Sequence, residues 1–196
     1  MPAMSTTAEP PRLRGDLAVW LLIGAELLTF GILFIAFAVA RWRSPAVFAA
    51  GQGSLTLASG VVNTVLLLSG SATVAGALSA ARAGRSAAAT RGLSAALVCA
   101  AAFLVLKGHE LAGKLAAGAD LDGDNFWTLY LMLTGFHFLH VAVAAVLLAL
   151  LWRPTRQGRY GPGTPQGCHP LETGAIFWHM VDLLWIVLFP LVYVLR

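Results

Sequence analysis

The apolar positions of this chain fall into five long, nearly unbroken runs instead of an alternating pattern. A transmembrane helix needs about 20 consecutive apolar residues, whereas a strand of a transmembrane barrel alternates over about 10 residues. The pattern therefore predicts an all-α fold: a polytopic membrane protein whose single domain, 17–196, is a bundle of five transmembrane helices. The predicted spans are about 17–40, 57–81, 92–111, 126–152 and 171–195, and a polar tail, 1–16, precedes them.

Composition supports a membrane protein with almost no extramembrane domain. Of the 196 residues, 58% are hydrophobic and 11% are charged, whereas soluble domains are about 45–50% apolar and 25% charged. The only cysteines, Cys99 and Cys168, lie far apart, form no metal or redox motif, and are expected to be inert. A basic soluble surface is missing, so we expect no nucleic-acid partner.

The distribution of basic residues predicts the orientation in the membrane, because lysine and arginine are enriched on the cytoplasmic side. Eight arginines fall on one side, so the N-terminus is predicted to be cytoplasmic and the C-terminus periplasmic. The basic side holds Arg12, Arg14, Arg82, Arg85, Arg91, Arg153, Arg156 and Arg159. The other side holds Arg41, Arg43, Lys114 and Arg196, with Asp120, Asp122 and Asp124. Residues near span ends are expected in an aromatic belt: Trp20, Trp42, Trp127, Trp152 and Tyr193.

Five ionisable side chains lie inside the apolar runs: Glu26, His137, His140, His179 and Asp182. Because a charge at the bilayer centre costs about 2.5–3.5 kcal/mol, such residues pair or serve a function. At about 1.5 Å per residue all five fall in one layer, where they meet if the first, fourth and fifth spans pack together. We expect Asp182 to bond His179 or a histidine of the fourth span, and Glu26 to face a partner subunit or a lipid-filled cleft. Interhelical hydrogen bonds without further function are the alternative.

A second polar group occupies the outer end of the third span, and further polar residues share faces of the second and fifth. Lys107, His109 and Glu110 form the group, and the spacing allows Glu110 to pair with Lys107 and with Lys114 in an ion-pair network at the membrane interface. Glu172 lies on one helical face with His179 and Asp182. In the second span, Asn63 and Thr64 suit interhelical hydrogen bonds. Small residues there allow close helix packing: Gly60, Ser69, Gly70, Ala72 and Gly76. Pro190 is expected to kink the last helix.

Nothing in the chain forms a catalytic centre of its own. A nucleophile–base pair, a phosphate-binding loop and a metal motif are all missing, and five histidines are too few for a haem–copper centre. A small b-type cytochrome with His140 and His179 as haem ligands is one alternative. An independent transporter is another, although the inverted repeats common in that class are not evident.

Two motifs and one buried acid resemble a known family. The stretch 134–141, Thr-Gly-Phe-His-Phe-Leu-His-Val, and the stretch 177–185, Phe-Trp-His-Met-Val-Asp-Leu-Leu-Trp, are similar to motifs of subunit III of haem–copper oxidases (cytochrome c oxidase subunit III). Glu26 matches the intramembrane glutamate of that family, and Asn63 and the stretch 108–110 match further positions. With five spans the chain resembles the shorter bacterial form. Lys107 stands where the family usually has glutamine, and the stretch 168–174 looks like the branch associated with nitric oxide reductases.

The resemblance implies a non-redox accessory subunit of a respiratory complex in the bacterial inner membrane. Such a subunit holds no haem, copper or other metal, binds phospholipid, and packs against a subunit I-type catalytic protein and other subunits. It supports assembly, sustained turnover and proton uptake by the catalytic subunit during aerobic electron transport. An accessory subunit of a nitric oxide reductase, in denitrification, is the alternative. The substrate, oxygen or nitric oxide, and the donor, cytochrome c or quinol, stay open.

Overall fold

A computed structural model describes residues 16–119 and 124–195 of the chain, and every regular element in those ranges is helical. The elements are α1 (Leu17–Arg43), α2 (Pro45–Gly53), α3 (Leu57–Arg82), α4 (Ser86–Ala116), α5 (Asn125–Arg156), α6 (His169–Phe189) and the π-helical turn η1 (Pro190–Val194). Five of these segments, with α6 and η1 counted together, are long and apolar enough to cross a membrane. The five-span helical bundle is therefore confirmed. Predictions on the tail before Asp16, on Asp120 and Asp122, and on Arg196 lie outside the described residues.

The helices extend beyond the apolar runs that predict them. Helix α4 begins at Ser86 and ends at Ala116, and α5 continues through Pro154 to Arg156. Polar ends of this kind carry no hydropathy signal, although their backbone continues the helix into the interfacial region. The short helix α2 is an element that the sequence pattern does not predict, and it begins with Pro45 in its first turn, where proline is favoured.

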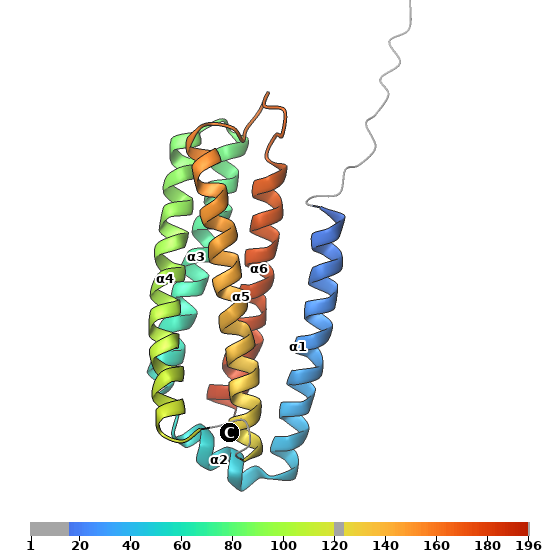
Figure 1. Ribbon diagram of the computed structural model, residues 1–196, viewed down its shortest axis with the longest axis vertical. Helices are drawn as coiled ribbons and strands as arrows, with labels where there is room; N and C mark the ends of the chain where they lie inside the picture. Colours follow the sequence, from blue (N-terminus) through green and yellow to red (C-terminus); the bar gives the residue numbers. More distant parts are fainter. Residues whose placement is uncertain (1–15, 120–123, 196) are drawn as a thin grey trace, which may run out of the picture.

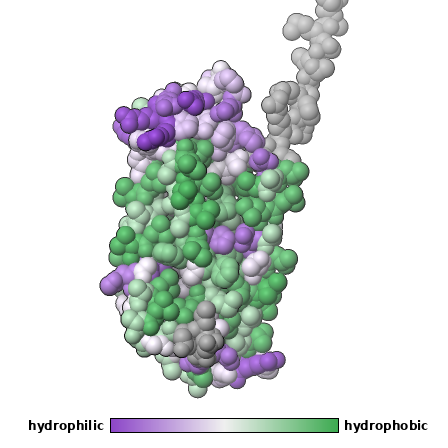
Figure 2. Space-filling model, in the orientation of Figure 1, coloured by the Kyte–Doolittle hydropathy of each residue, from purple (hydrophilic) through white to green (hydrophobic). Residues whose placement is uncertain are grey.

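Four of the long helices, α3 to α6, form a bundle, and α1 packs against α5 and α6 from outside it. Figure 1 shows α1 converging with α5 toward α2, which crosses one end of the bundle, and separating from it toward the opposite end. We call this opposite end the basic end, because five arginines lie there: Arg82, Arg85, Arg153, Arg156 and Arg159. Figure 2 shows a broad hydrophobic belt between this hydrophilic cap and the α2 end. Such a belt is the surface that a bilayer requires.

Close helix packing depends on two of the predicted small residues. A Cβ atom at Gly60 would lie 2.6 Å from Phe189 Cε2, and one at Gly70 would lie 2.8 Å from Trp178 Cζ2. Both glycines therefore let α6 approach α3. Gly76 does not have this role, because a Cβ atom there would meet nothing within 4 Å.

The last helix changes its hydrogen-bonding pattern at Pro190, where a kink is predicted. Because proline has no N–H, the backbone passes from α6 into the π-helical turn η1, in which Leu195 N–H donates to Pro190 O at 2.9 Å. Gln52 Nε2 of α2 lies 3.0–3.3 Å from three carbonyl oxygens of this segment, those of Leu191, Val192 and Leu195. Arg41 Nη1 donates to the same Leu195 oxygen at 2.8 Å. Gln52 of α2 and Arg41 of α1 thus satisfy carbonyls at the interrupted end of the last helix.

Candidate functional site

The half-buried acid of the first span is paired with a histidine of α5. Glu26 Oε2 lies 3.1 Å from His140 Nε2, and the two side chains are 24% and 16% exposed. His140 Nδ1 lies 2.7 Å from Phe136 O, and since a carbonyl only accepts, Nδ1 carries a hydrogen. The pair bridges the middle parts of α1 (Leu17–Arg43) and α5 (Asn125–Arg156). Glu26 and His140 are thus brought together as part of the predicted layer.

A groove opens beside this pair toward the basic end. It has a volume of about 620 Å³ and lies between α1, α5 and α6, with Val143, Leu147 and Phe177 among its lining residues. Val143 follows His140 by less than one helical turn, so the Glu26–His140 pair lies next to the inner end of the groove. The lining is mostly aliphatic and aromatic, with Asp16 and His169 at the basic end.

Asp182 and His179 of α6 do not join this pair, which corrects the predicted contact. Ser71 Oγ of α3 donates to Asp182 Oδ2 at 2.7 Å and accepts from Trp178 Nε1 at 3.1 Å. His179 Nδ1 lies 3.2 Å from Ser71 Oγ as well. Since the hydroxyl has one hydrogen and two lone pairs, His179 Nδ1 is the donor. Asp182 therefore joins α6 to α3 through a serine, and not to a histidine of α5.

His137, the fifth residue of the predicted layer, lies in the bundle core. Its side chain is fully buried, with its ring centre 5.8 Å from that of Phe103 and 5.0 Å from that of Trp185. Within the described residues neither ring nitrogen has a hydrogen-bond partner, and the same holds for the side chain of buried Asn63. Of the two residues expected to form interhelical hydrogen bonds, Thr64 does so, because its Oγ1 accepts from Trp185 Nε1 at 2.9 Å.

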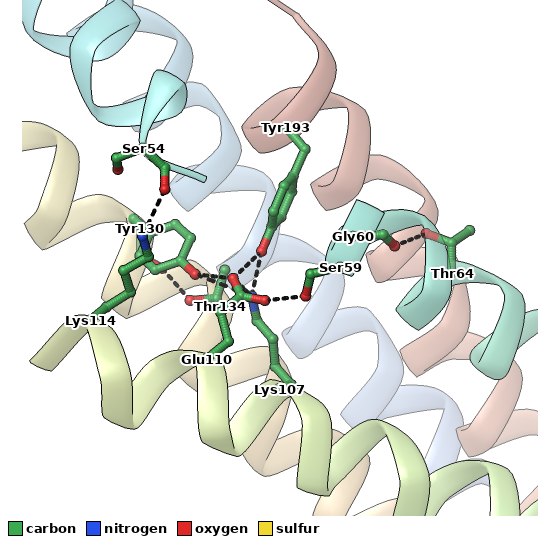
Figure 3. Close-up of polar contacts among 10 residues, drawn as sticks. All are labelled: Ser54, Ser59, Gly60, Thr64, Lys107, Glu110, Lys114, Tyr130, Thr134 and Tyr193. Atoms are coloured by element: carbon green, nitrogen blue, oxygen red, sulfur yellow. Dashed lines mark hydrogen bonds and ion pairs between the residues drawn. The ribbon is translucent and has the colours of Figure 1, made fainter. Parts of the chain in front are cut away.

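A buried cluster at the α2 end joins four segments around Lys107 and Glu110 (Figure 3). Lys107 is fully buried, and its Nζ lies 2.9 Å from Glu110 Oε1. The same ammonium donates to the hydroxyls of Tyr130 and Tyr193. Both hydroxyls donate to Glu110 Oε1, at 2.7 and 2.6 Å, and Ser59 Oγ donates to Glu110 Oε2 at 2.6 Å. Every ammonium hydrogen has an acceptor, so the cluster is a satisfied ion pair.

Two predictions for this end of the bundle are wrong: the contact of Lys114 with Glu110, and the place of Tyr193 in an aromatic belt. Lys114 does not pair with Glu110: its Nζ donates to Ser54 O at 2.8 Å and lies 5.7 Å from the ring centre of Trp127. Tyr193 does not belong to an aromatic belt, since it is 5% exposed and its hydroxyl is in the cluster. His109 is exposed on α4. Glu172 forms an ion pair with Arg82 at 2.8 Å at the basic end.

The environment of Cys168 disfavours its thiolate, and the two candidate haem ligands face different helices. Partial burial and the nearby Glu172 carboxylate raise the pKa of the Cys168 thiol above its usual range, so the thiol stays protonated. His140 faces α1 and His179 faces α3. The imidazole pair that a b-type haem requires is therefore not brought together.

Three hydroxyl residues of these sites are not predicted from the sequence: Ser59, Ser71 and Tyr130. Serine is common in transmembrane helices and by itself carries no site signal. Tyr130 carries a weak signal, because it is the only tyrosine inside the apolar run of its span.

Comparison with known proteins places the chain in a family. Residues 16–196 match the family of cytochrome c oxidase subunit III. The chain is 33% identical over 178 residues to cytochrome c oxidase subunit 3 of Synechocystis sp., covering 90% of this chain and 74% of that protein. It is 29% identical over 185 residues to heme-copper oxidase subunit I+III of Aeropyrum pernix, covering 90% and 22%.

A third relative is matched over part of its length. The chain is 36% identical over 99 residues to cytochrome c oxidase subunit 3 of Thermostichus vulcanus, covering 50% of this chain and 48% of that protein. The chain thus spans about half the length of this relative.

None of these matches favours the nitric oxide reductase alternative, which stays a prediction. With five apolar spans and a match along nearly all its length, the chain belongs to the cytochrome c oxidase subunit III family, the accessory third subunit of haem–copper oxidases.

Proposed function

We propose that the chain supports proton uptake and sustained turnover by a subunit I-type catalytic protein of a respiratory haem–copper oxidase. The observation that carries this proposal is the Glu26–His140 pair, held half-buried at mid-depth beside the α1–α5–α6 groove. The Aeropyrum pernix relative, named subunit I+III, supports a partner of the subunit I type. Haem and copper belong to that partner in this proposal.

The geometry of the pair supports a proton-holding role. With Nδ1–H directed at Phe136 O, a bond between Nε2 and Glu26 needs one further hydrogen between the two atoms. That proton resides on the imidazole or on the carboxyl, and the pair is neutral either way. A neutral pair can reside in a bilayer at little electrostatic cost, whereas loss of the proton leaves one negative charge at about 14 Å from the start of α1. The pair therefore holds one proton at a defined place, between Glu26 Oε2 and His140 Nε2.

The groove between α1, α5 and α6 supports the expectation of a bound phospholipid. Its lining of Val19, Leu147 and Phe177 fits an acyl chain, and its mouth at the basic end carries Asp16 and His169. The nearest mid-depth polar groups, Glu26 and His140, already bond each other. An acyl chain, which has no hydrogen-bonding group, can therefore lie there without leaving them unpaired.

Replacing the acid of this pair tests the proposed role. We expect Glu26→Gln complexes to assemble, because glutamine keeps the shape and can donate an amide hydrogen to His140 Nε2. The number of turnovers before inactivation, or the rate of proton uptake, should change because the amide cannot exchange a proton with His140. Enzyme assays over many turnovers at several pH values measure this.

Thr29→Val is the matched control, since Thr29 lies about one turn along α1 and, among the described residues, its side chain bonds only Ala25 O of its own helix. It should behave like wild type. Wild-type turnover of Glu26→Gln at every pH would leave Glu26 with a packing role only.

The orientation in a bacterial inner membrane is a separate proposal, supported by the arginines of the basic end. In a chain whose Cys99 and Cys168 are replaced by serine, a membrane-impermeant thiol reagent added outside should label Trp42→Cys and not Arg156→Cys. Trp42 is 81% exposed at the α2 end, and Arg156 lies at the basic end. Labelling of Arg156→Cys from the periplasmic side would show that the orientation is opposite to the one proposed.

A further inference from the structure

We propose that the catalytic subunit docks one of its transmembrane helices against the α3–α6 face. This face consists of the exposed small residues of the basic half of α3 together with His179 of α6. The residues are Ser69, Ala72, Ala75, Gly76, Ser79 and His179. The inference rests on the proposed function for the identity of the partner, and it specifies where that partner binds.

The first argument is the size of the exposed side chains. The basic half of α3 exposes alanine, glycine and serine, and a Cβ atom at Gly76 would meet nothing within 4 Å. Leu139 and Val146 on the outer face of α5 are instead 60% and 59% exposed. Small residues let helix backbones approach each other in a bilayer, so a second helix can pack closely on this part of α3.

The second argument is an unsatisfied polar group at mid-depth. His179 is exposed about 15 Å from the start of α6, and Ser71 is its only bonding partner in the described part of the chain. Because Nδ1 donates to Ser71, Nε2 of the neutral ring is left as an acceptor. Nε2 therefore needs a hydrogen-bond donor from outside the chain.

The depth of His179 Nε2 decides between lipid and protein as the occupant. Acyl chains at the centre of a bilayer have no donor, and an unsatisfied polar group in hydrocarbon is costly. The Glu26–His140 pair satisfies itself and tolerates lipid, whereas His179 does not. The α3–α6 face therefore fits a transmembrane helix that has small residues at the contact and a donor side chain opposite His179.

Photocrosslinking from the purified complex tests the assignment. A diazirine amino acid at position 72 of α3 should give a covalent adduct with the catalytic subunit, and one at position 146 of α5 should not. Val146 is 59% exposed on the outer face of α5. An adduct of position 72 with lipid only, or with a second copy of this chain, would overturn the assignment.

A larger side chain on the α3–α6 face provides a second test. Ala72→Leu should lower the yield of co-purified catalytic subunit by about tenfold, because the added side chain separates the two helices. Ala149→Leu, the same change at an exposed position of α5, should leave the yield unchanged. Equal losses from both variants, or none from Ala72→Leu, would contradict the docking surface. If wild-type chain co-purifies with no haem protein, the proposed function fails instead.

Discussion

Replacing Lys107 with methionine should lower the free energy of unfolding by about 3–5 kcal/mol, the usual cost of removing one partner of a buried ion pair. Methionine fills a similar volume but leaves the Glu110 carboxylate without its ammonium partner inside the bundle. Because Tyr130, Tyr193 and Ser59 bond this carboxylate, the contacts between four segments weaken together. Thermal unfolding of the subunit in mild detergent measures the loss.

A second variant separates the lost charge from the lost packing. Lys107→Met combined with Glu110→Gln removes both charges, while the amide oxygen still accepts hydrogen bonds from the tyrosine hydroxyls. Replacing both partners of a buried pair is often nearly neutral, so the double variant should recover most of the stability lost by Lys107→Met. If the double variant is as unstable as the single one, the ion pair is not what holds this end together.

The variant Lys107→Gln, which introduces the glutamine usual in the family, should give an intermediate result. A glutamine amide donates to Glu110 and accepts from a tyrosine, but it does not neutralise the carboxylate. Its free energy of unfolding should therefore fall between those of wild type and Lys107→Met, as measured by the same unfolding transition.

The depth of each polar residue can be predicted from the sequence, whereas its direction around the helix cannot. Counting along the apolar runs places Glu26 and His140 at similar depth, and the structure pairs them. The same counting places Asp182 in that layer, yet its side chain faces α3. Helices that are apolar on all sides have no amphipathic face to fix their rotation. Depth follows from the rise per residue, and direction depends on packing.

The partners of the buried charges are missed for a related reason. Lys107 and Glu110 are evident as charges near a span end, and their spacing predicts their contact. Tyr130 and Tyr193 complete the pair from α5 and η1, and the position of Tyr193 depends on the helix change at Pro190. Lys114 bonds Ser54, the residue that follows α2. No apolar periodicity predicts that short helix, so its contacts are not predicted either.

The packing of α2 against α5 predicts a large effect from one added side chain. Gly51 lies against the ring of Phe126, and a Cβ atom at Gly51 would overlap that ring. Phe126 is fully buried, packs edge-to-face on Phe48 and stacks on Tyr130 with ring centres 5.9 Å apart. It therefore has little room to move. Gly51→Val should lower the free energy of unfolding by about 3 kcal/mol, at the upper end of the usual cost of overpacking.

Two further variants test the cause of this loss. Gly53→Val places the same side chain on α2 where a Cβ atom would meet nothing within 4 Å, so it should cost much less. Phe126→Leu makes room for the valine. The loss of stability in the double variant should therefore be smaller than the sum of the two single losses. Thermal unfolding in mild detergent gives all four stabilities. Equal losses from Gly51→Val and Gly53→Val would show that α2 is sensitive to valine itself, and that contact with Phe126 does not set the cost.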